Sequence, residues 1–277
     1  MVRSGRWVPH RAAWRWLAVV AALLALCGCA TTQVQHNPLA TWDPSPNFNQ
    51  RKPFLIVLHF TQEASVQQAL HTLKTRNPGG PVSAHFLVAR DGHIYQLVAG
   101  KDRAWHAGAG RWGTITDVNS ASLGIEIDNT GDETYTPVQI GALLKLLTSL
   151  CDRWHIPRTQ IIGHEDLAPT RRSDPGQYFP WHELAEHGFG LWPHGKLVNP
   201  PPGFDPWLAL AAIGYPVNAT DRGAVVHAFH NHFRGMGSNS IPGNVIAGQP
   251  VHPWSWDKLD AQDLRILYAL VRQRGEY

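Results

Sequence analysis

Cysteine is scarce in this chain of 277 residues, which contains only Cys27, Cys29 and Cys151. The first two lie close together in an N-terminal apolar segment, and Cys151 stands alone in a predicted helix. Cysteines placed in this way exclude a disulfide framework as the source of stability. We expect Cys151 to be a small buried apolar residue. With 43% hydrophobic residues, the chain is predicted to be stabilised by an ordinary apolar core.

The sequence also lacks a large excess of charge of either sign. Lys and Arg together number 24 and Asp and Glu 21, so that the formal net charge is +3. A nucleic-acid-binding protein needs a concentrated basic stripe. We therefore predict no nucleic-acid partner, whereas the small positive balance mildly favours an anionic surface or polymer.

A hydrophobic run of membrane-spanning length is missing as well. The apolar stretch from Leu17 to Leu26 is shorter than the roughly 20 residues that a transmembrane helix needs. Four arginines precede it within residues 3–15. A basic segment followed by a short apolar segment predicts an exported protein with a secretory signal.

The end of this signal carries the sequence Leu-Cys-Gly-Cys over residues 26–29. It resembles the lipobox of exported lipoproteins, which implies a lipoprotein signal peptide over residues 1–28, cleavage after Gly28 and a lipid anchor on Cys29. Ala30 would then be the second mature residue, which by the same resemblance implies an outer-membrane lipoprotein facing the periplasm. The alternative is a plain secretory signal with two incidental cysteines.

The rest of the chain predicts an α/β (α+β) fold with a central mixed β-sheet flanked by helices, over residues 53–195. Residues 29–52 are polar and interrupted by proline, and they are predicted to form a tether. Apolar or alternating runs predict strands at 54–60, 84–89, 93–98, 123–128 and 160–162, and helical periodicity predicts helices at 64–76 and 137–151. The second and third strands are joined through Arg90-Asp91-Gly92, a hairpin signal.

A small C-terminal three-helix domain is predicted over residues 205–277. Three prolines near residue 200 mark a linker over 196–204. Helical periodicity then follows at 206–213, 221–233 and 261–272, which is typical of a compact bundle of short helices.

Candidate metal ligands lie in the sequence GHEDLAPTRRSDPG, residues 163–176, which contains His164 and Asp174. His59 lies at the end of the first predicted strand. Two imidazoles and one carboxylate, with the fourth position left to water, are typical of a catalytic zinc site. A single histidine at a strand end is more often a packed or surface residue, so the prediction depends on the three occurring together.

Further motifs accompany His59 and the 163–176 loop. They are VSAHFLVARDG at 82–92, RAWHAG at 103–108 and LGIEIDN at 123–129, with GYPV at 214–217 and AVVHAF at 224–229 in the helical part. The motifs within residues 53–195 occur in the order found in zinc N-acetylmuramoyl-L-alanine amidases, and this part of the chain resembles that family, in particular its outer-membrane lipoprotein members. Residues 205–277 separately resemble a peptidoglycan-binding domain.

The resemblance implies one Zn²⁺ per chain, with His59, His164 and Asp174 as ligands. It makes Glu126 the catalytic base, against the alternative of an ordinary solvated strand residue. It places an oxyanion-stabilising role on Arg172, where the family often has Lys. Arg keeps the positive charge but has a different geometry, so the role does not transfer automatically.

The implied reaction is hydrolysis of the amide between N-acetylmuramic acid, or its anhydro form, and the L-alanine of the stem peptide. The implied partners are peptidoglycan or muropeptides, and a membrane through the lipid anchor. His106, His85 and Arg90 are candidate substrate contacts, although His85 is equally a half-buried strand residue and Arg90 a solvated charge. The rival hypothesis is a non-catalytic peptidoglycan-recognition protein.

Overall fold

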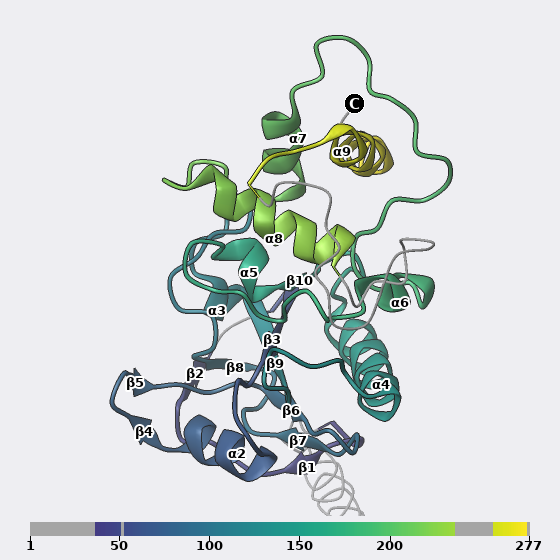
Figure 1. Ribbon diagram of the computed structural model, residues 1–277. Helices are drawn as coiled ribbons and strands as arrows, with labels where there is room; N and C mark the ends of the chain where they lie inside the picture. Colours follow the sequence, from purple (N-terminus) through teal and green to yellow (C-terminus); the bar gives the residue numbers. More distant parts are fainter. Residues whose placement is uncertain (1–36, 51–52, 236–256, 276–277) are drawn as a thin grey trace, which may run out of the picture. The chain divides into compact units, whose positions relative to one another are not determined.

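The computed structural model describes residues 37–50, 53–235 and 257–275, whose arrangement is drawn in Figure 1. The predicted signal peptide and Cys29 lie outside the described residues. Among the helices described, none is long and apolar enough to cross a membrane.

The centre of the fold is a six-stranded sheet within the described residues. Strand β3 pairs in parallel with β9 and β10, β9 pairs in parallel with β6, and β6 and β7 form the predicted antiparallel hairpin. The sheet is therefore mixed, and the predicted fold class is confirmed. In spatial order the strands are β1 (Thr41–Trp42), β7 (Ile94–Gln96), β6 (Phe86–Val88), β9 (Ser122–Ile127), β3 (Leu55–Phe60) and β10 (Ile161–Gly163).

One face of the sheet is covered by helix α4 (Pro137–Trp154). Pro137 occupies the first turn, where its missing N–H costs nothing, and the Thr136 side chain accepts a hydrogen bond from Gln139 N at 3.1 Å. Ile140, Leu143 and Leu147 recur at helical spacing and are fully buried with the sheet residues. The amphipathic periodicity thus fixes which side of α4 packs on the sheet.

The opposite face is covered by helix α2 (Val66–Lys74), which begins at the capping residue Ser65. Its buried residues Ala69 and Leu73 form a second apolar cluster with Leu87 and Leu97 of the hairpin region. The sheet is therefore buried on both faces, which is why β3 and β9 consist almost entirely of buried residues.

Smaller elements complete the domain. They are β2 (Phe48–Gln50) paired with β8 (Asp102–Ala104), β4 (Arg76–Asn77) paired with β5 (Gly80–Pro81), and helices α3 (Val118–Ala121), α5 (His164–Leu167) and α6 (Trp181–Glu186). Two strands, β1 and β2, lie in the segment predicted to be a tether. Asn37 is buried there and its side chain donates to Ser149 Oγ at 2.7 Å. Residues 37–50 therefore differ from an extended tether because they add strands to the domain.

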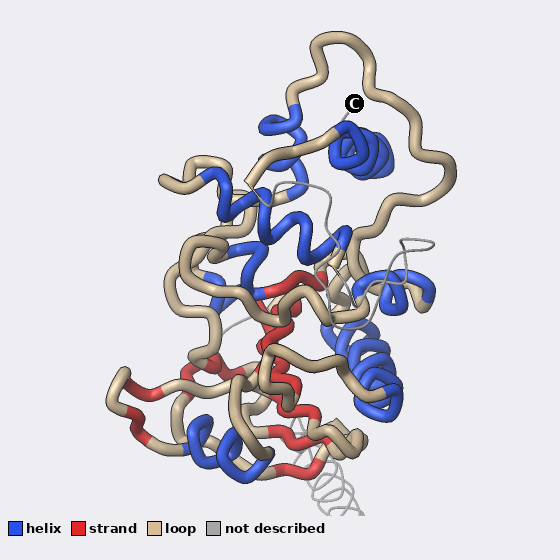
Figure 2. The backbone as a smooth tube through the Cα atoms, in the orientation of Figure 1, coloured by secondary structure: helices blue, strands red, loops and turns tan. Residues whose placement is uncertain are grey.

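Three helices follow near the predicted positions: α7 (Pro206–Ile213), α8 (Arg222–Arg234) and α9 (Ala261–Gln273). Residues 196–204 contain no helix or strand. After β10, which ends at Gly163, the described residues form only helices and loops, drawn in blue and tan in Figure 2. The apolar residues of α7, α8 and α9 belong to the same continuous cluster as α4 and the sheet. The division into two domains remains a prediction.

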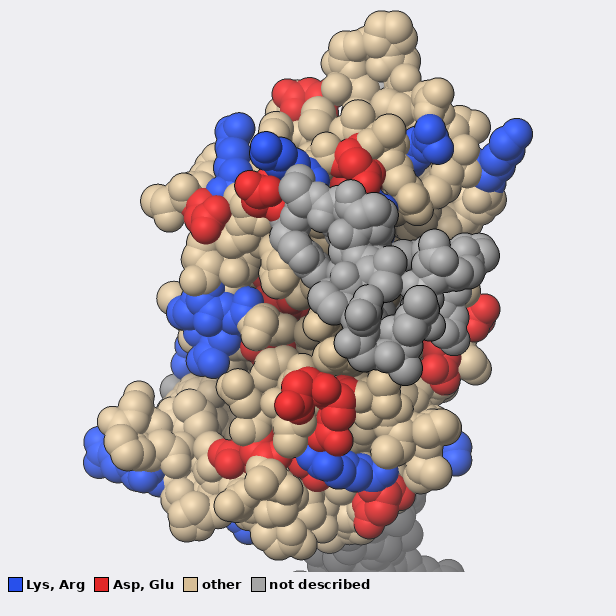
Figure 3. Space-filling model, in the orientation of Figure 1, with Lys and Arg blue, Asp and Glu red and all other residues tan. Residues whose placement is uncertain are grey.

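Charged side chains of both signs are interspersed on the molecular face drawn in Figure 3. This distribution follows the sequence, in which acidic and basic residues nearly balance. That face therefore carries no continuous surface of one sign.

Candidate metal centre and active site

The candidate site lies where three neighbouring parallel strands end. In the register of β3 and β9, His59 is opposite Glu126, and in that of β3 and β10, Leu58 is opposite Gly163. His164 follows directly after β10. Because carboxyl ends of adjacent parallel strands meet at one edge of a sheet, three side chains far apart in the sequence reach the same place.

The three predicted ligands converge there. His59 Nδ1 lies 2.8 Å from Asp174 Oδ2, and His164 Nδ1 lies 3.0 Å from the same oxygen. All three side chains are buried, with exposed fractions of 2%, 2% and 6% for His59, His164 and Asp174. One ligand atom from each lies within 4.8 Å of the others. The structure thus brings together a set that can hold one metal ion.

The protonation of these ligands suits a metal. His164 Nε2 lies 2.8 Å from the carbonyl oxygen of Ala107, which can only accept, so this nitrogen carries the proton. The other ring nitrogen, Nδ1, faces Asp174 at 3.0 Å. Burial and the neighbouring His164 hold the pKa of His59 at about 4, although Asp174 acts in the opposite direction. Two imidazoles packed on one carboxylate form a donor set that fits zinc.

Glu126 lies beside this set on β9 and is half-buried. Burial raises its pKa well above the ordinary value, the charge of Asp174 raises it further, and Arg172 acts to lower it. Perturbed carboxyl groups beside a metal-ligand cluster are typical of proton-transfer sites. The position and chemistry of Glu126 therefore suit a general base.

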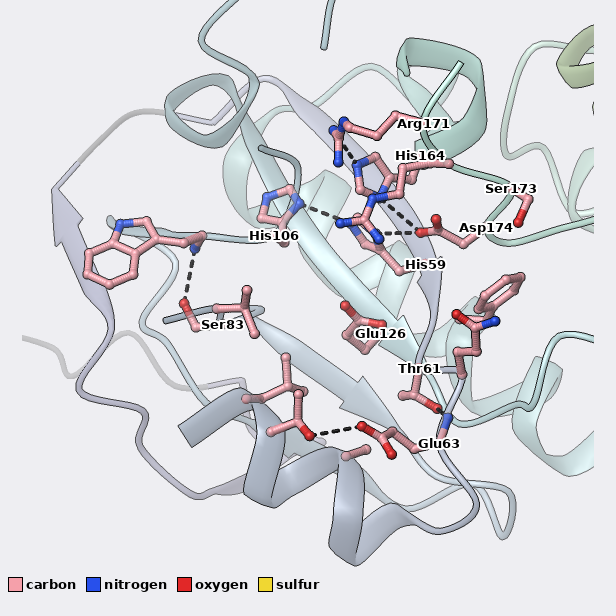
Figure 4. A pocket seen from close by; sticks show the side chains of 18 residues that line it. His59, Thr61, Glu63, Ser83, His106, Glu126, His164, Arg171, Ser173 and Asp174 are labelled. Atoms are coloured by element: carbon pink, nitrogen blue, oxygen red, sulfur yellow. Dashed lines mark hydrogen bonds and ion pairs between the residues drawn. The ribbon is translucent and has the colours of Figure 1, made fainter. Parts of the chain in front are cut away.

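These side chains line a cavity of about 290 Å³. Figure 4 shows His59, His164 and Asp174 pointing toward one another, with Glu126 near them. Ser83 and the segment bearing Trp105 lie on one side, joined by a hydrogen bond of 3.0 Å from Trp105 N to Ser83 Oγ. The cavity is open and partly polar, and it can accept part of an extended polar ligand beside the metal ligands.

Arg172 lines the cavity and is exposed. The adjacent Arg171, which the sequence analysis did not single out, donates through Nη2 to Ala107 O at 2.6 Å and also to Ala109 O. Arg171 therefore holds the loop that accepts the hydrogen bond of His164. The only signal for Arg171 in the sequence is its position next to Arg172 in the motif of residues 163–176.

His106 also lines the cavity, and its Nδ1 lies 3.0 Å from Nε2 of His59. The ring packs directly over Gly124, where an added Cβ would collide with three ring atoms. The glycine of the strand motif is thus explained by the close approach of an imidazole to the backbone.

His85 and Arg90 are not brought into the cavity. Nε2 of the fully buried His85 donates to Asp102 O at 3.0 Å, and its Nδ1 accepts from Gly124 N at 3.0 Å. Arg90 pairs with Glu133 at 2.7 Å. This geometry favours structural roles, with His85 joining neighbouring backbone segments and Arg90 forming an ion pair.

A buried polar cluster that the sequence analysis missed connects the metal-ligand loop to the C-terminal helices. Asp166 Oδ1 accepts from Tyr215 Oη at 2.6 Å, while Oδ2 lies 2.8 Å from His232 Nδ1. Glu165 Oε2 accepts from Asn231 Nδ2 at 2.7 Å. These contacts span 49 to 66 residues of sequence and carry no local signal by which they could have been found.

Comparison with known proteins agrees with this geometry. A family model described as N-acetylmuramoyl-L-alanine amidase matches residues 49–177. The N-acetylmuramoyl-L-alanine amidase AmiD of Escherichia coli (strain K12) is 32% identical over 253 residues, covering 79% of this chain and 90% of that protein. The chain belongs to the N-acetylmuramoyl-L-alanine amidase family. The predicted family and the predicted enzyme class are thereby confirmed.

This chain is also similar to another curated amidase and to solved structures of amidases. The 1,6-anhydro-N-acetylmuramyl-L-alanine amidase AmpD of Haemophilus influenzae is 39% identical over 101 residues, covering 36% of this chain and 55% of that protein. A solved complex of the Escherichia coli AmiD with anhydro-N-acetylmuramic acid-L-Ala-D-gamma-Glu-L-Lys has a TM-score of 0.65 and 30% identity, covering 82% of this chain and 92% of that one. AMPDH3 of Pseudomonas aeruginosa with an anhydromuramic pentapeptide has a TM-score of 0.66 and 28% identity, covering 87% and 99%.

Proposed function

We propose that this amidase uses one zinc ion to cleave the amide between N-acetylmuramic acid, or its anhydro form, and the L-alanine of the stem peptide. The observation that carries the proposal is the convergence of His59, His164 and Asp174 beside Glu126 in one open cavity. The related structures whose ligands are anhydromuramyl peptides support the substrate class.

Zinc bound by the three ligands would supply Lewis acidity to the scissile carbonyl and lower the pKa of the attacking water. Glu126 accepts the proton of that water, and its raised pKa makes it a better base than an exposed carboxylate. Arg172 contributes positive charge opposite the oxygen that becomes negative. The proton then passes from Glu126 to the departing amine of L-alanine.

The first experiment removes the metal. Chelation should abolish the release of stem peptides from purified peptidoglycan, and added zinc should restore it. Identification of the new amino terminus tests the bond that is cleaved, because L-alanine is expected there. Activity that is insensitive to chelation would overturn the metal assignment, and an amino terminus further along the stem would overturn the proposed bond.

The second experiment tests the base. Glu126→Ala should retain one zinc per chain and lose turnover, whereas Glu186→Gln, at an exposed carboxylate on α6, should behave as the wild type. A Glu126→Ala protein with normal turnover would exclude Glu126 as the base. A wild-type protein that binds muropeptides without turnover would instead support the non-catalytic recognition protein.

We further propose that the protein is an exported lipoprotein of the outer membrane, with the lipid on Cys29 and with peptidoglycan held by the C-terminal helices. The sequence of residues 1–29 supports the first part, and the resemblance of residues 205–277 to peptidoglycan-binding domains supports the second. Wild-type protein should incorporate labelled palmitate and sediment with outer membranes. Cys29→Ala should do neither, and equal labelling of both would refute the anchor.

A further inference from the structure

A continuous chain of hydrogen bonds runs behind the metal-ligand cluster. It starts at the ligand His59, whose Nε2 lies 3.0 Å from His106 Nδ1. His106 Nε2 in turn lies 3.2 Å from the Ser122 hydroxyl oxygen. Ser122 donates its proton to the backbone carbonyl of Val118 at 2.6 Å. The chain thus ends on an acceptor that can never donate.

Because the Val118 carbonyl can only accept, it sets the donor and the acceptor in each hydrogen bond between His59 and Ser122. A hydroxyl has one proton, and that of Ser122 is given to Val118 O, so Ser122 Oγ must accept from His106 Nε2. With this proton on Nε2, an uncharged ring of His106 has an unprotonated Nδ1, which accepts a hydrogen bond from His59 Nε2–H. His59 is left with its lone pair on Nδ1, the atom that faces Asp174 at 2.8 Å.

We infer that His106 and Ser122 are positioning residues that hold His59 in the one tautomer able to bind the metal through Nδ1. The inference rests on the metal site of the proposed function and assigns to His106 a role different from substrate contact. Second partners of this kind orient a ligand imidazole and set its tautomer, and their loss typically costs about 10- to 100-fold in metal affinity.

The surrounding structure holds His59, His106 and Ser122 in position. Asn119 Oδ1 accepts from His106 N at 3.1 Å and from Ala107 N at 2.9 Å, which fixes the loop. Gly124 leaves room for the imidazole. Ser122 is fully buried at the start of β9, directly after α3, the helix that contains Val118. The chain of bonds therefore has little freedom to rearrange.

A matched pair of substitutions tests the role of His106. In His106→Asn, the side-chain oxygen can occupy the position of Nδ1 and accept from His59, whereas His106→Leu has a similar shape and no acceptor. We expect the zinc dissociation constant, measured by competition with a chromophoric chelator, to rise by about 10- to 100-fold in His106→Leu. His106→Asn should stay within about threefold of the wild type. Equal zinc affinity in both variants would overturn the inference.

Ser122 is tested against a neighbouring serine. Ser122→Ala should weaken zinc binding measurably. Ser120→Ala removes a half-buried hydroxyl that bonds only Asp117 among the described residues, and it should leave zinc binding unchanged. In the His106→Asn background, Ser122→Ala should have no further effect on zinc affinity, because the asparagine oxygen accepts without help. If Ser122→Ala weakens zinc binding as much in that background as in the wild type, Ser122 has a packing role, and the inference that it acts through His106 is refuted.

The tautomers can also be observed directly in the zinc-loaded protein. Long-range proton–nitrogen correlation spectra of isotope-labelled histidine should show His59 and His106 both protonated on Nε2, with a mixture of forms at His106 in Ser122→Ala. A His106 protonated on Nδ1 in the wild type would refute the inference. Failure of the wild type itself to bind zinc would refute the proposed function instead, so that the two failures are distinguishable.

Discussion

Replacing Tyr215 with phenylalanine tests whether the C-terminal helices stabilise the metal-ligand loop. The Tyr215 hydroxyl donates to Asp166 at 2.6 Å, and both residues are buried, with exposed fractions of 3% and 0%. Asp166 also accepts from Gly163 N at 2.7 Å and bonds His232 at 2.8 Å, so it ties the beginning of α5 to α8. Tyr215→Phe removes one of three bonds to a buried carboxylate and leaves the shape unchanged.

The size of the effect follows from the charge and burial of the acceptor. A hydrogen bond to a charged group contributes about 1.5–3 kcal/mol, and the carboxylate oxygen that loses its donor is fully buried. We therefore expect Tyr215→Phe to lower the free energy of unfolding by about 2 kcal/mol. With a urea dependence of about 3 kcal/mol/M, the unfolding midpoint falls by roughly 0.7 M.

The assay must distinguish unfolding of the helices from loss of the metal site. Unfolding in urea should be followed both by circular dichroism and by loss of peptide release, since the second reports only on the metal site. Both curves should shift together in Tyr215→Phe, and Tyr95→Phe, which removes a half-buried hydroxyl on β7, should leave both within about 0.5 kcal/mol of the wild type. An activity curve that does not move while the helical signal does would refute the stabilisation of the loop.

Three further outcomes are expected. Because the pKa of Glu126 is raised by burial and by Asp174, the rate should fall as pH decreases through a value above 4.5, and a rate that is constant there would exclude Glu126 as the base. Arg172→Lys should retain most of kcat, while Arg172→Met should lower kcat by about 100- to 1000-fold with a smaller change in KM, as for other oxyanion-stabilising groups. An equal loss of kcat in the two variants would exclude a role for the charge. Finally, the metal-free protein should lose stability as pH falls from 6.5 towards 4, by up to about 3 kcal/mol, because the unfolded chain binds a proton at His59 that the buried ring refuses. Urea midpoints that are constant over this range would contradict the last expectation.

The elements of the fold were largely predictable because local periodicity and capping determine them. Helix α4 begins at Pro137 as its sequence predicts, and α7 spans the predicted residues. The strands β3 and β9 follow from uninterrupted apolar or alternating runs. Strands β1 and β2 were missed because two- and three-residue strands in a polar, proline-rich segment have no periodicity of their own. They form only because the sheet edge and β8 offer partners.

The candidate site, like the fold, was predictable from the sequence only in part. Its ligand types and the carboxylate Glu126 are visible in the sequence motifs, and parallel strand pairing explains why they meet. The roles of neighbouring residues were not visible. His106, a predicted substrate contact, lines the cavity and also lies against His59, whereas His85 is held by two backbone groups.

The sequence by itself therefore determined the family, the strand and helix pattern, and the identity of the residues that can hold a metal. Only the tertiary structure decided which nitrogen of each ligand faces the centre, and that Arg171, Ser122 and Tyr215 support it. The physical reason is the separation in sequence between the residues that interact. Periodicity and motifs record interactions between residues close in sequence, while a hydrogen bond such as that from Tyr215 to Asp166 depends on how whole elements pack.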